Sequence, residues 1–245
     1  MDLKQYEQLA KDYEEYKAAG KIWGVVRQER ISKLKFPRID KNIIEAFKAL
    51  DDVTSTVSDV LDSMGIAGAV SASHCRPVLP GRKIVGTAIT LRNIPERMTV
   101  TEGYVHKRYN DIRLATKDMY YLAEPGDVLV VDGTGSLDIS HIGGQSCTVA
   151  KACGMAGTVV DGCVRDIDTI RKLDYPIWSK GVTPITGKFR IEAMKRAVER
   201  DDYKKGEASI GITRYIFDAD EYKRLMAEAY DNYARIVEIE KGWSK

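Results

Sequence analysis

The chain lacks an excess of charge of either sign. Its 245 residues include 38 lysines and arginines against 36 aspartates and glutamates, which gives a formal net charge of +2. Proteins that bind nucleic acid usually carry a clear basic excess, because neutralising phosphates supplies most of their affinity. The composition therefore argues against nucleic acid as the main partner.

Long apolar runs are missing as well. The longest uninterrupted ones hold about four or five residues, as at Val128–Val131, whereas a membrane-spanning helix needs about 20. The N-terminus, residues 1–5, is charged and has no apolar stretch typical of an export signal. We therefore expect a cytoplasmic protein without a membrane partner.

Cysteine is scarce and its spacing is uninformative. The four cysteines, Cys75, Cys147, Cys153 and Cys163, form no Cys-x-x-Cys pair. A chain of this length can bury a core without cross-links, so we expect free thiols in a reducing compartment. A zinc site that adds His141 to the last three is an alternative, but it lacks the short ligand spacing of structural zinc sites.

Three common fingerprints are absent from the chain. There is no Gly-x-Gly-x-x-Gly, no Gly-Lys-Ser/Thr phosphate loop and no Gly-x-Ser-x-Gly nucleophile elbow. The sequence therefore does not support a dinucleotide site, a P-loop or an α/β-hydrolase triad.

Helical periodicity marks both ends of the chain. Residues 3–19 place Tyr6, Leu9, Tyr13 and Tyr16 three or four positions apart, which predicts an amphipathic helix ended by Gly20. We expect this N-terminal arm to pack on the body or on a neighbouring subunit. Further helices are expected at 40–50, 111–122, 191–204 and 219–240, a short helix capped by Ser55 or Thr56 and ended by Gly65, and strands at 83–91, 175–178 and 208–217.

The centre of the chain contains a short internal repeat. Val-Val-Asp-Gly occurs at 130–133 and again at 159–162, and the segment 144–153 between them has the composition of a helix. Two apolar strands joined by a glycine-rich loop and a helix predict a βαβ unit with a parallel strand pair. We therefore expect an α/β fold with this unit at its core.

Chemically useful residues follow both strands of this unit. Gly143 and Gly144 begin the predicted helix, and Arg165-Asp166 follows the second strand. Bare N–H groups at a helix start and an arginine fork both suit a carboxylate, and an aspartate suits a hard divalent cation. His141 flanks the same loop and is a candidate acid–base group. A packing role for the glycines and a surface ion pair for Arg165-Asp166 are the alternatives.

These residues resemble the RraA-like family. The family includes 4-hydroxy-4-methyl-2-oxoglutarate / 4-carboxy-4-hydroxy-2-oxoadipate aldolases and the regulator of ribonuclease E activity. The most specific signal is Gly144 followed, after twenty residues, by Arg165-Asp166. The resemblance covers about residues 52–193, and its other motifs are Ser58-Asp59, Pro80-Gly81, Gly86-x-Ala88, Pro125-Gly126-Asp127, Gly154-x-x-Gly157 and Gly187-Lys-Phe-Arg190.

The resemblance implies a divalent-metal lyase that cleaves a small anionic 2-keto acid to pyruvate through a metal-stabilised enolate, with oxaloacetate decarboxylation as a side activity. It implies that Arg165 binds the carboxylate and stabilises the enolate, and that Asp166 holds Mg²⁺ or Mn²⁺. Backbone amides of the glycine loop would complete the anion site. The implied substrate-binding set is Gly143, Gly144, Gln145, Ser146 and Arg165.

Several positions depart from the family pattern. The acid that follows Arg-Asp in the aldolases is replaced by Thr169, and the nearest acid, Asp168, stands one position earlier. A tryptophan before the glycines is replaced by Ile142, next to His141. His141 and Asp168 are therefore accessory candidates. The family's C-terminal strand pair, and the acid that a neighbouring subunit supplies from that region, are not recognisable here.

The resemblance also implies a swivelling β/β/α domain, with added terminal helices, in a homotrimer or homohexamer. We expect a helical arm at 1–40, an RraA-like catalytic domain at 41–193 and a divergent C-terminal part at 194–245. Two alternatives to the aldolase remain: other metal–enolate chemistry of an isomerase or hydratase type, and a non-catalytic regulator that acts by binding.

Overall fold

A computed structural model describes residues 3–22, 28, 31, 34–95, 99–105, 116–187 and 190–194. Within these ranges the chain divides into two compact units. One unit contains the N-terminal residues up to Phe36 and the segment from Ala72 onward, and the other contains Pro37–Ser71. The bounds predicted for the arm, the catalytic domain and the C-terminal part stay a prediction.

The described part of the smaller unit contains two helices, α2 (Lys41–Ala49) and α3 (Val53–Ser63). The Asp40 side chain caps α2 by accepting the Asn42 N–H at 2.7 Å. The cap predicted for the second helix is wrong, because α3 begins before Ser55 and Thr56 and has Asp52 at its N-cap position. Instead, Thr56 Oγ1 donates to the Asp52 carbonyl.

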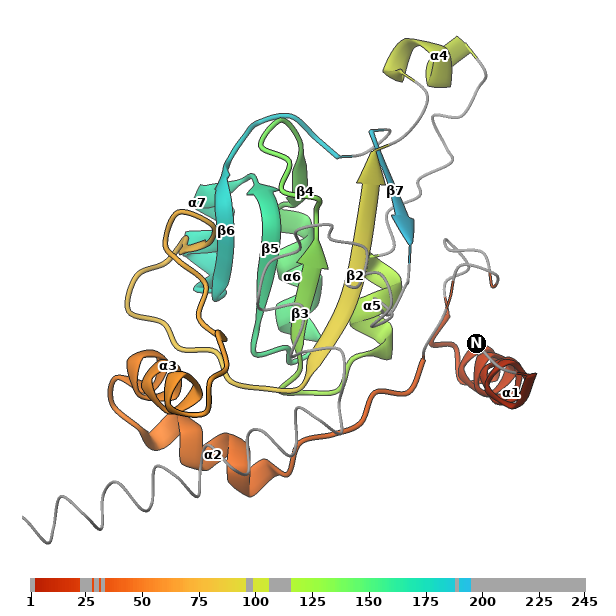
Figure 1. Cartoon of the computed structure of the whole chain (residues 1–245). Helices are drawn as coiled ribbons and strands as arrows, with labels where there is room; N and C mark the ends of the chain where they lie inside the picture. The colour runs from red at the N-terminus through yellow and green to blue at the C-terminus, as the bar shows by residue number, and fades with distance from the viewer. Residues whose placement is uncertain are drawn as a thin grey trace, which may run out of the picture. The chain divides into compact units, whose positions relative to one another are not determined.

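A single sheet of seven strands forms the centre of the larger unit (Figure 1). Its path is β1-β6-β5-β3-β2-β7, and β4 pairs with β5 beyond the end of β3. The inner strands run parallel, whereas the edge strands β1 and β7 are antiparallel to their neighbours. The bounds are β1 (Arg76–Pro77), β2 (Ala88–Pro95), β3 (Val128–Asp132), β4 (Ser140–Ile142), β5 (Gly157–Val164), β6 (Ile177–Val182) and β7 (Ile191–Met194).

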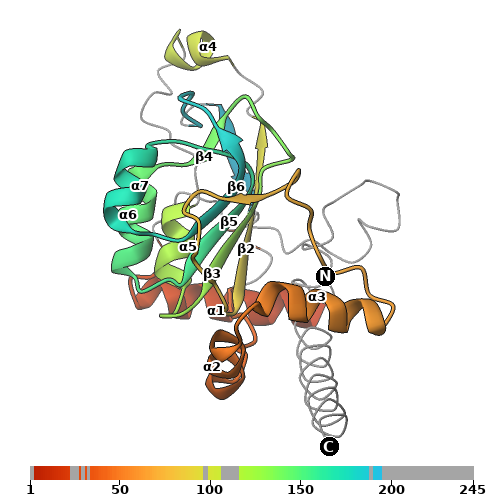
Figure 2. The same ribbon diagram turned by 90° about the vertical axis from the view of Figure 1, so that its left-hand side faces the viewer.

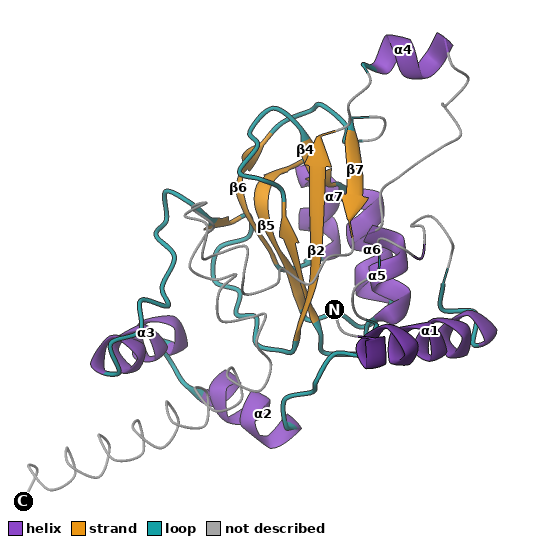
Figure 3. Ribbon diagram, turned by 45° about the vertical axis from the view of Figure 1, so that its right-hand side comes forward, coloured by secondary structure: helices purple, strands orange, loops and turns teal. Residues whose placement is uncertain are grey.

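Three helices of this unit lie on one face of the sheet (Figure 2). They are α5 (Thr116–Leu122), α6 (Gly144–Ala152) and α7 (Ile167–Leu173). Helix α6 connects β4 to β5, and α7 connects β5 to β6. Figure 3 shows α5, α6 and α7, in purple, beside the orange strands. The repeated Val-Val-Asp-Gly segments pair in parallel, with Val130 opposite Val159 and Asp132 opposite Asp161. The predicted βαβ unit is therefore confirmed.

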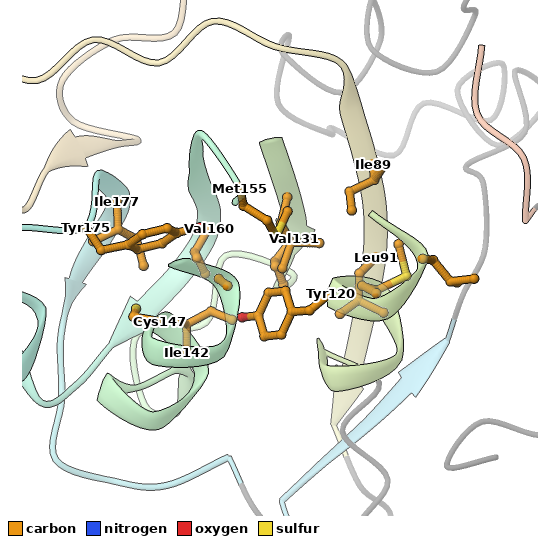
Figure 4. Packing of buried hydrophobic residues seen from close by; sticks show 14 of the residues in the cluster. Ile89, Leu91, Tyr120, Val131, Ile142, Cys147, Met155, Val160, Tyr175 and Ile177 are labelled. Atoms are coloured by element: carbon orange, nitrogen blue, oxygen red, sulfur yellow. The ribbon is translucent and has the colours of Figure 1, made fainter. Parts of the chain in front are cut away.

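The hydrophobic core fills the space between the sheet and these helices (Figure 4). Leu129 and Val131 of β3 and Val160 of β5 are fully buried there. Tyr120 of α5 extends across the core toward α6, and Tyr175 shares a buried hydrogen bond of 2.9 Å with Thr158 Oγ1. Burial of this apolar surface is the main force that fixes the helices on the sheet.

The N-terminal helix α1 (Leu3–Ala18) belongs to the larger unit. The predicted apolar stripe packs in part, because Leu9, Tyr13 and Tyr16 lie against the core while Tyr6 is 63% exposed. Gly20 follows the helix with φ +69°, as expected of a C-terminal glycine. Packing of the arm on the body is therefore confirmed.

Two other predicted elements differ from the structure. The strand expected at 83–91 begins only at Ala88, where pairing with Val128 of β3 starts. The helix expected at 191–204 is wrong at its start, because residues 191–194 form β7 and pair with β2. The remainder of that helix, the strand at 208–217 and the helix at 219–240 lie outside the described residues. α4 (Val100–Val105), α7, β1 and β4 were not predicted.

Within the described residues, no helix combines the length and the apolar character that crossing a membrane requires.

Candidate functional site

The start of α6 and the end of β5 meet at the carboxyl edge of the parallel strands. The backbone N–H of Arg165 donates to the carbonyl of Ile142 at 3.0 Å. This bond joins the residue before the glycine pair to the first residue after β5. Ligands of open α/β sheets collect at this edge, so the predicted residues are gathered where a ligand is expected.

Asp166 bridges the two elements through its side chain. Its Oδ2 accepts the Gly144 N–H at 2.9 Å and lies 3.5 Å from Arg165 Nε. Asp166 itself has φ +60° and stands at the N-cap position of α7, yet its side chain makes no capping bond to that helix. Aspartate tolerates this left-handed conformation better than most residues. The turn thus directs the carboxylate to α6 instead of to α7.

The glycine pair leaves room for these side chains. A Cβ at Gly143 would lie 2.6 Å from Asp166 Oδ2 and 3.1 Å from Arg165 Nε. A Cβ at Gly144 would lie 2.7 Å from the Thr169 side chain. A side chain at either position would therefore force its neighbours to shift: the ends of the Asp166 and Arg165 side chains at Gly143, and Thr169 at Gly144.

The helix start has two N–H groups to offer a ligand. Gly143, at the N-cap position of α6, has no side chain to cap it. The Gly144 N–H is taken by Asp166, and the Cys147 N–H bonds to the Gly143 carbonyl. In the part of the chain that the structure describes, no acceptor is recorded for the N–H groups of Gln145 and Ser146. Of the predicted amide set, the Gly144 N–H is therefore already bonded, while the N–H groups of Gln145 and Ser146 lie at the positive end of the helix dipole.

Arg165 is positioned to bind an anion. Its side chain is 39% exposed, and within the described ranges its one recorded ion pair is the 3.5 Å contact with Asp166. The Asp166 side chain is 42% exposed. An arginine fork and two helix N–H groups on one solvent-facing edge form a suitable carboxylate site.

The two accessory candidates lie elsewhere. Asp168 is 90% exposed and faces Arg171 on its own helix, at 3.5 Å. Its neighbour Thr169 is the residue that lies against Gly144. His141 lies on β4 and is only 5% exposed. Burial lowers its pKa from 6.5 to about 4, against a smaller opposing effect of Asp132, so the ring is neutral near pH 7.

The aspartates of the repeat are engaged in ion pairs of their own. Asp132 accepts Arg92 Nε at 2.7 Å and the Thr134 N–H at 2.9 Å. Asp161 lies 3.2 Å from Lys180 Nζ, and burial nevertheless raises its pKa. Sequence reasoning did not identify these pairs, because Arg92 and Lys180 are remote in the chain from the residues they bind.

The predicted metal ligand, Asp166, has a carboxylate that reaches solvent. Asp166 has a second carboxylate oxygen, Oδ1, that no recorded bond within those residues uses. The described ranges contain no group of three or more histidine, cysteine, aspartate or glutamate side chains placed to hold an ion. An exposed carboxylate fits a hard cation such as Mg²⁺, which keeps several waters and needs only one or two protein oxygens.

Comparison with known proteins agrees with this geometry. A family profile described as RraA-like (Aldolase/RraA) matches residues 54–203, more than half of the chain. DlpA from Legionella pneumophila is 31% identical over 138 residues, which are 56% of this chain and 20% of that protein. A protein from Halalkalibacterium halodurans named "Putative 4-hydroxy-4-methyl-2-oxoglutarate aldolase" is 33% identical over 130 residues, 53% of each chain.

A solved structure has a similar fold. The crystal structure of an uncharacterized protein from Pseudomonas syringae pv. tomato superposes with a TM-score of 0.50 and 28% identity over 65% of each chain. The chain spans about half or less of the length of the first curated relatives it matches. The profile match covers both halves of the βαβ unit and the Arg165-Asp166 turn. The chain therefore belongs to the RraA-like family.

Proposed function

We propose that the protein is a lyase that cleaves a 2-keto acid such as 4-hydroxy-4-methyl-2-oxoglutarate to pyruvate. One observation carries the proposal: the Asp166 carboxylate links the start of α6 to Arg165 at one edge of the sheet. The aldolase name of the relative at 33% identity supports the substrate class.

The chemistry follows from where negative charge develops. Breaking the C3–C4 bond of a 4-hydroxy-2-keto acid leaves an electron pair on C3, which the adjacent keto oxygen receives as an enolate. The C4 hydroxyl loses its proton to solvent as C4 becomes the carbonyl of the second product, and protonation of C3 then gives pyruvate. Arg165 would bind the substrate carboxylate, and the N–H groups of Gln145 and Ser146 would face the developing charge. Donors that are already oriented stabilise such charge strongly, because they need not reorganise during the reaction.

A divalent cation is part of the proposal. Mg²⁺ or Mn²⁺ bound through Asp166 would supply Lewis-acid stabilisation at the keto oxygen. The hydrogen bond from the Gly144 N–H leaves one Asp166 oxygen to bind the cation. Water, substrate and any further ligand would complete the coordination shell of the cation. Loss of carbon dioxide from oxaloacetate produces the same enolate, so oxaloacetate decarboxylation is the proposed side activity.

The test follows pyruvate formation with Mg²⁺ and either 4-hydroxy-4-methyl-2-oxoglutarate or oxaloacetate. Because free Mg²⁺ itself assists oxaloacetate decarboxylation, the matched control is Arg165→Ala protein in the same buffer. We expect pyruvate above this background from the wild-type protein and a loss of the excess with a chelator. Folded, metal-supplied protein that makes no pyruvate from either substrate would reject the lyase. Assembly into trimers or hexamers stays a prediction from the family resemblance.

A further inference from the structure

His141 connects the two copies of the repeat. A Cβ at Gly133 would lie 2.6 Å from His141 Nε2, and a Cβ at Gly162 would lie 2.6 Å from its Cδ2 and 2.8 Å from Nε2. The imidazole therefore packs against the backbone of the residue that ends each Val-Val-Asp-Gly segment. At Gly162 this side chain occupies the space next to the glycine, whereas at Gly133 the Asp161 carbonyl lies nearer still.

A buried hydrogen bond fixes the ring from the other side. Asn93 Nδ2 and His141 Nδ1 are 3.1 Å apart, and Asn93, on β2, is 1% exposed. If the amide donates, the neutral ring carries its proton on Nε2. Among the described residues, Nε2 and Asn93 Oδ1 have no hydrogen-bond partner. The His141 ring belongs to β4 and thus lies beside Asn93 of β2, Gly133 at the end of β3, and Gly162 of β5.

The position of this ring determines where the site lies. Ile142 follows His141 directly and accepts the Arg165 N–H, and Gly143 then begins the turn into α6. A displaced imidazole would move the donors of α6 and the backbone of Arg165 together. The side chain itself, at 5% exposure, is shielded from a ligand.

We propose that His141 is a positioning residue: its contacts with Gly133, Gly162 and Asn93 hold β4 so that the α6 amides and Arg165 face the same ligand. The proposal rests on the lyase function proposed above. The histidine moves no proton in the reaction; it acts through Ile142 and the glycine pair.

A double-mutant cycle tests the placement without any assay of activity. In Gly162→Ala, the new methyl meets the imidazole, and the next nearest atom is Ser136 O at 3.3 Å. Removing the ring should therefore restore the space, so the Gly162→Ala His141→Ala double variant should melt at a higher temperature than additivity predicts. Gly133→Ala is the matched control, because its methyl also meets the Asp161 backbone carbonyl, which the loss of the ring does not move. Adding His141→Ala should not rescue it.

A second measurement tests the positioning role. Oxalate, a planar dianion shaped like the pyruvate enolate, is titrated into the Mg²⁺-supplied wild-type and His141→Gln proteins by calorimetry. We expect about tenfold weaker binding and about a hundredfold lower kcat/KM, the scale of a small misplacement of catalytic groups. The pH profile of kcat/KM should keep its shape.

Distinct outcomes separate the two proposals. Additive melting temperatures in the Gly162 cycle, or wild-type oxalate affinity in folded His141→Gln, would overturn the positioning role. Loss of one ionisation from the pH profile would overturn it in favour of acid–base catalysis. Wild-type protein that neither binds oxalate nor forms pyruvate contradicts the lyase, whereas the Gly162 cycle still decides where the ring lies.

Discussion

The Asp166 carboxylate caps a helix other than its own. It accepts the first N–H of α6, from Gly144, across 22 positions of sequence, although Asp166 itself precedes α7. The side chain therefore serves both the fold and the proposed chemistry: one oxygen holds α6, and the other is left for a cation. Because the two oxygens have different uses, substitutions of Asp166 can separate the effect on stability from the effect on activity.

Asp166→Ala should destabilise the protein. The variant loses the cap of α6 and places alanine at φ +60°, at a cost of about 1–2 kcal/mol in the free energy of unfolding. Chemical denaturation measures this cost. Asp168→Ala, at a 90% exposed position, is the control and should change stability by less than about 0.5 kcal/mol.

Asp166→Asn should separate the two uses. Asparagine tolerates the left-handed conformation and can still accept the Gly144 N–H, so the free energy of unfolding should stay near that of the wild type. The neutral amide is a poor ligand for Mg²⁺, so metal-dependent pyruvate formation should fall sharply. Equal activity in Asp166→Asn and wild-type protein would show that the metal is held elsewhere.

The pH dependence of stability should report the burial of His141. The pKa of this histidine is 6.5 in a model peptide and about 4 in the folded protein. Between these values the unfolded chain binds the proton and the folded chain does not, so stability falls as the pH falls through this range. The two values correspond to about 3 kcal/mol at most.

Comparing wild-type protein with His141→Gln isolates this effect from the carboxylates that titrate nearby. The difference in unfolding free energy between the two should be constant above about pH 7 and shrink toward pH 4. If this difference in unfolding free energy does not vary with pH, the pKa of His141 is the same in the folded and the unfolded protein. Burial would then not keep the proton off the ring.

Local sequence pattern was enough to predict the βαβ unit, because both strands are uninterrupted apolar runs that end in glycine. It was not enough for the C-terminal strand. Residues 191–194 have helical composition, but pairing with Arg92–Pro95 makes them a strand, and the preference of such a segment depends on its partner. The same reason explains why the strand expected from residue 83 begins only at Ala88, opposite Val128.

The sequence predicted which residues belong to the candidate site, but not how their side chains contact one another. Spacing alone brought Arg165, Asp166 and the glycine pair to one edge of the sheet. The bond from Gly144 to Asp166, and the contact of His141 with two glycines, depend on side-chain directions that no local pattern encodes. The sequence offered one signal for the His141 contact, the glycine that ends both Val-Val-Asp-Gly segments. That this glycine makes room for a side chain is visible only in the structure, where His141 lies between the strands.

Thiol labelling should distinguish Cys147 from the partly exposed Cys153. All four cysteines are free, and Cys147 of α6 is fully buried, which raises its pKa to about 12. Because the thiolate is the reactive form, a reagent at pH 8 should label Cys147 after Cys153, only when α6 opens. The partly exposed Cys153 serves as the internal comparison. Rapid labelling of Cys147 in native buffer would show that α6 leaves the sheet readily.

Replacing Arg165 should weaken anion binding in a graded way. Arg165→Lys keeps the charge but loses the fork that grips a carboxylate with two bonds. We expect about tenfold weaker oxalate binding in Arg165→Lys and about a hundredfold in Arg165→Ala, the scale of losing one or two hydrogen bonds to a charged group.

Arg171→Ala is the matched control, because Arg171 lies on the neighbouring helix, is 64% exposed and pairs with Asp168. The oxalate affinity of Arg171→Ala should match that of the wild-type protein. An equal loss in the Arg165 and Arg171 variants would mean that the protein attracts oxalate through its overall charge, and that Arg165 forms no specific carboxylate site.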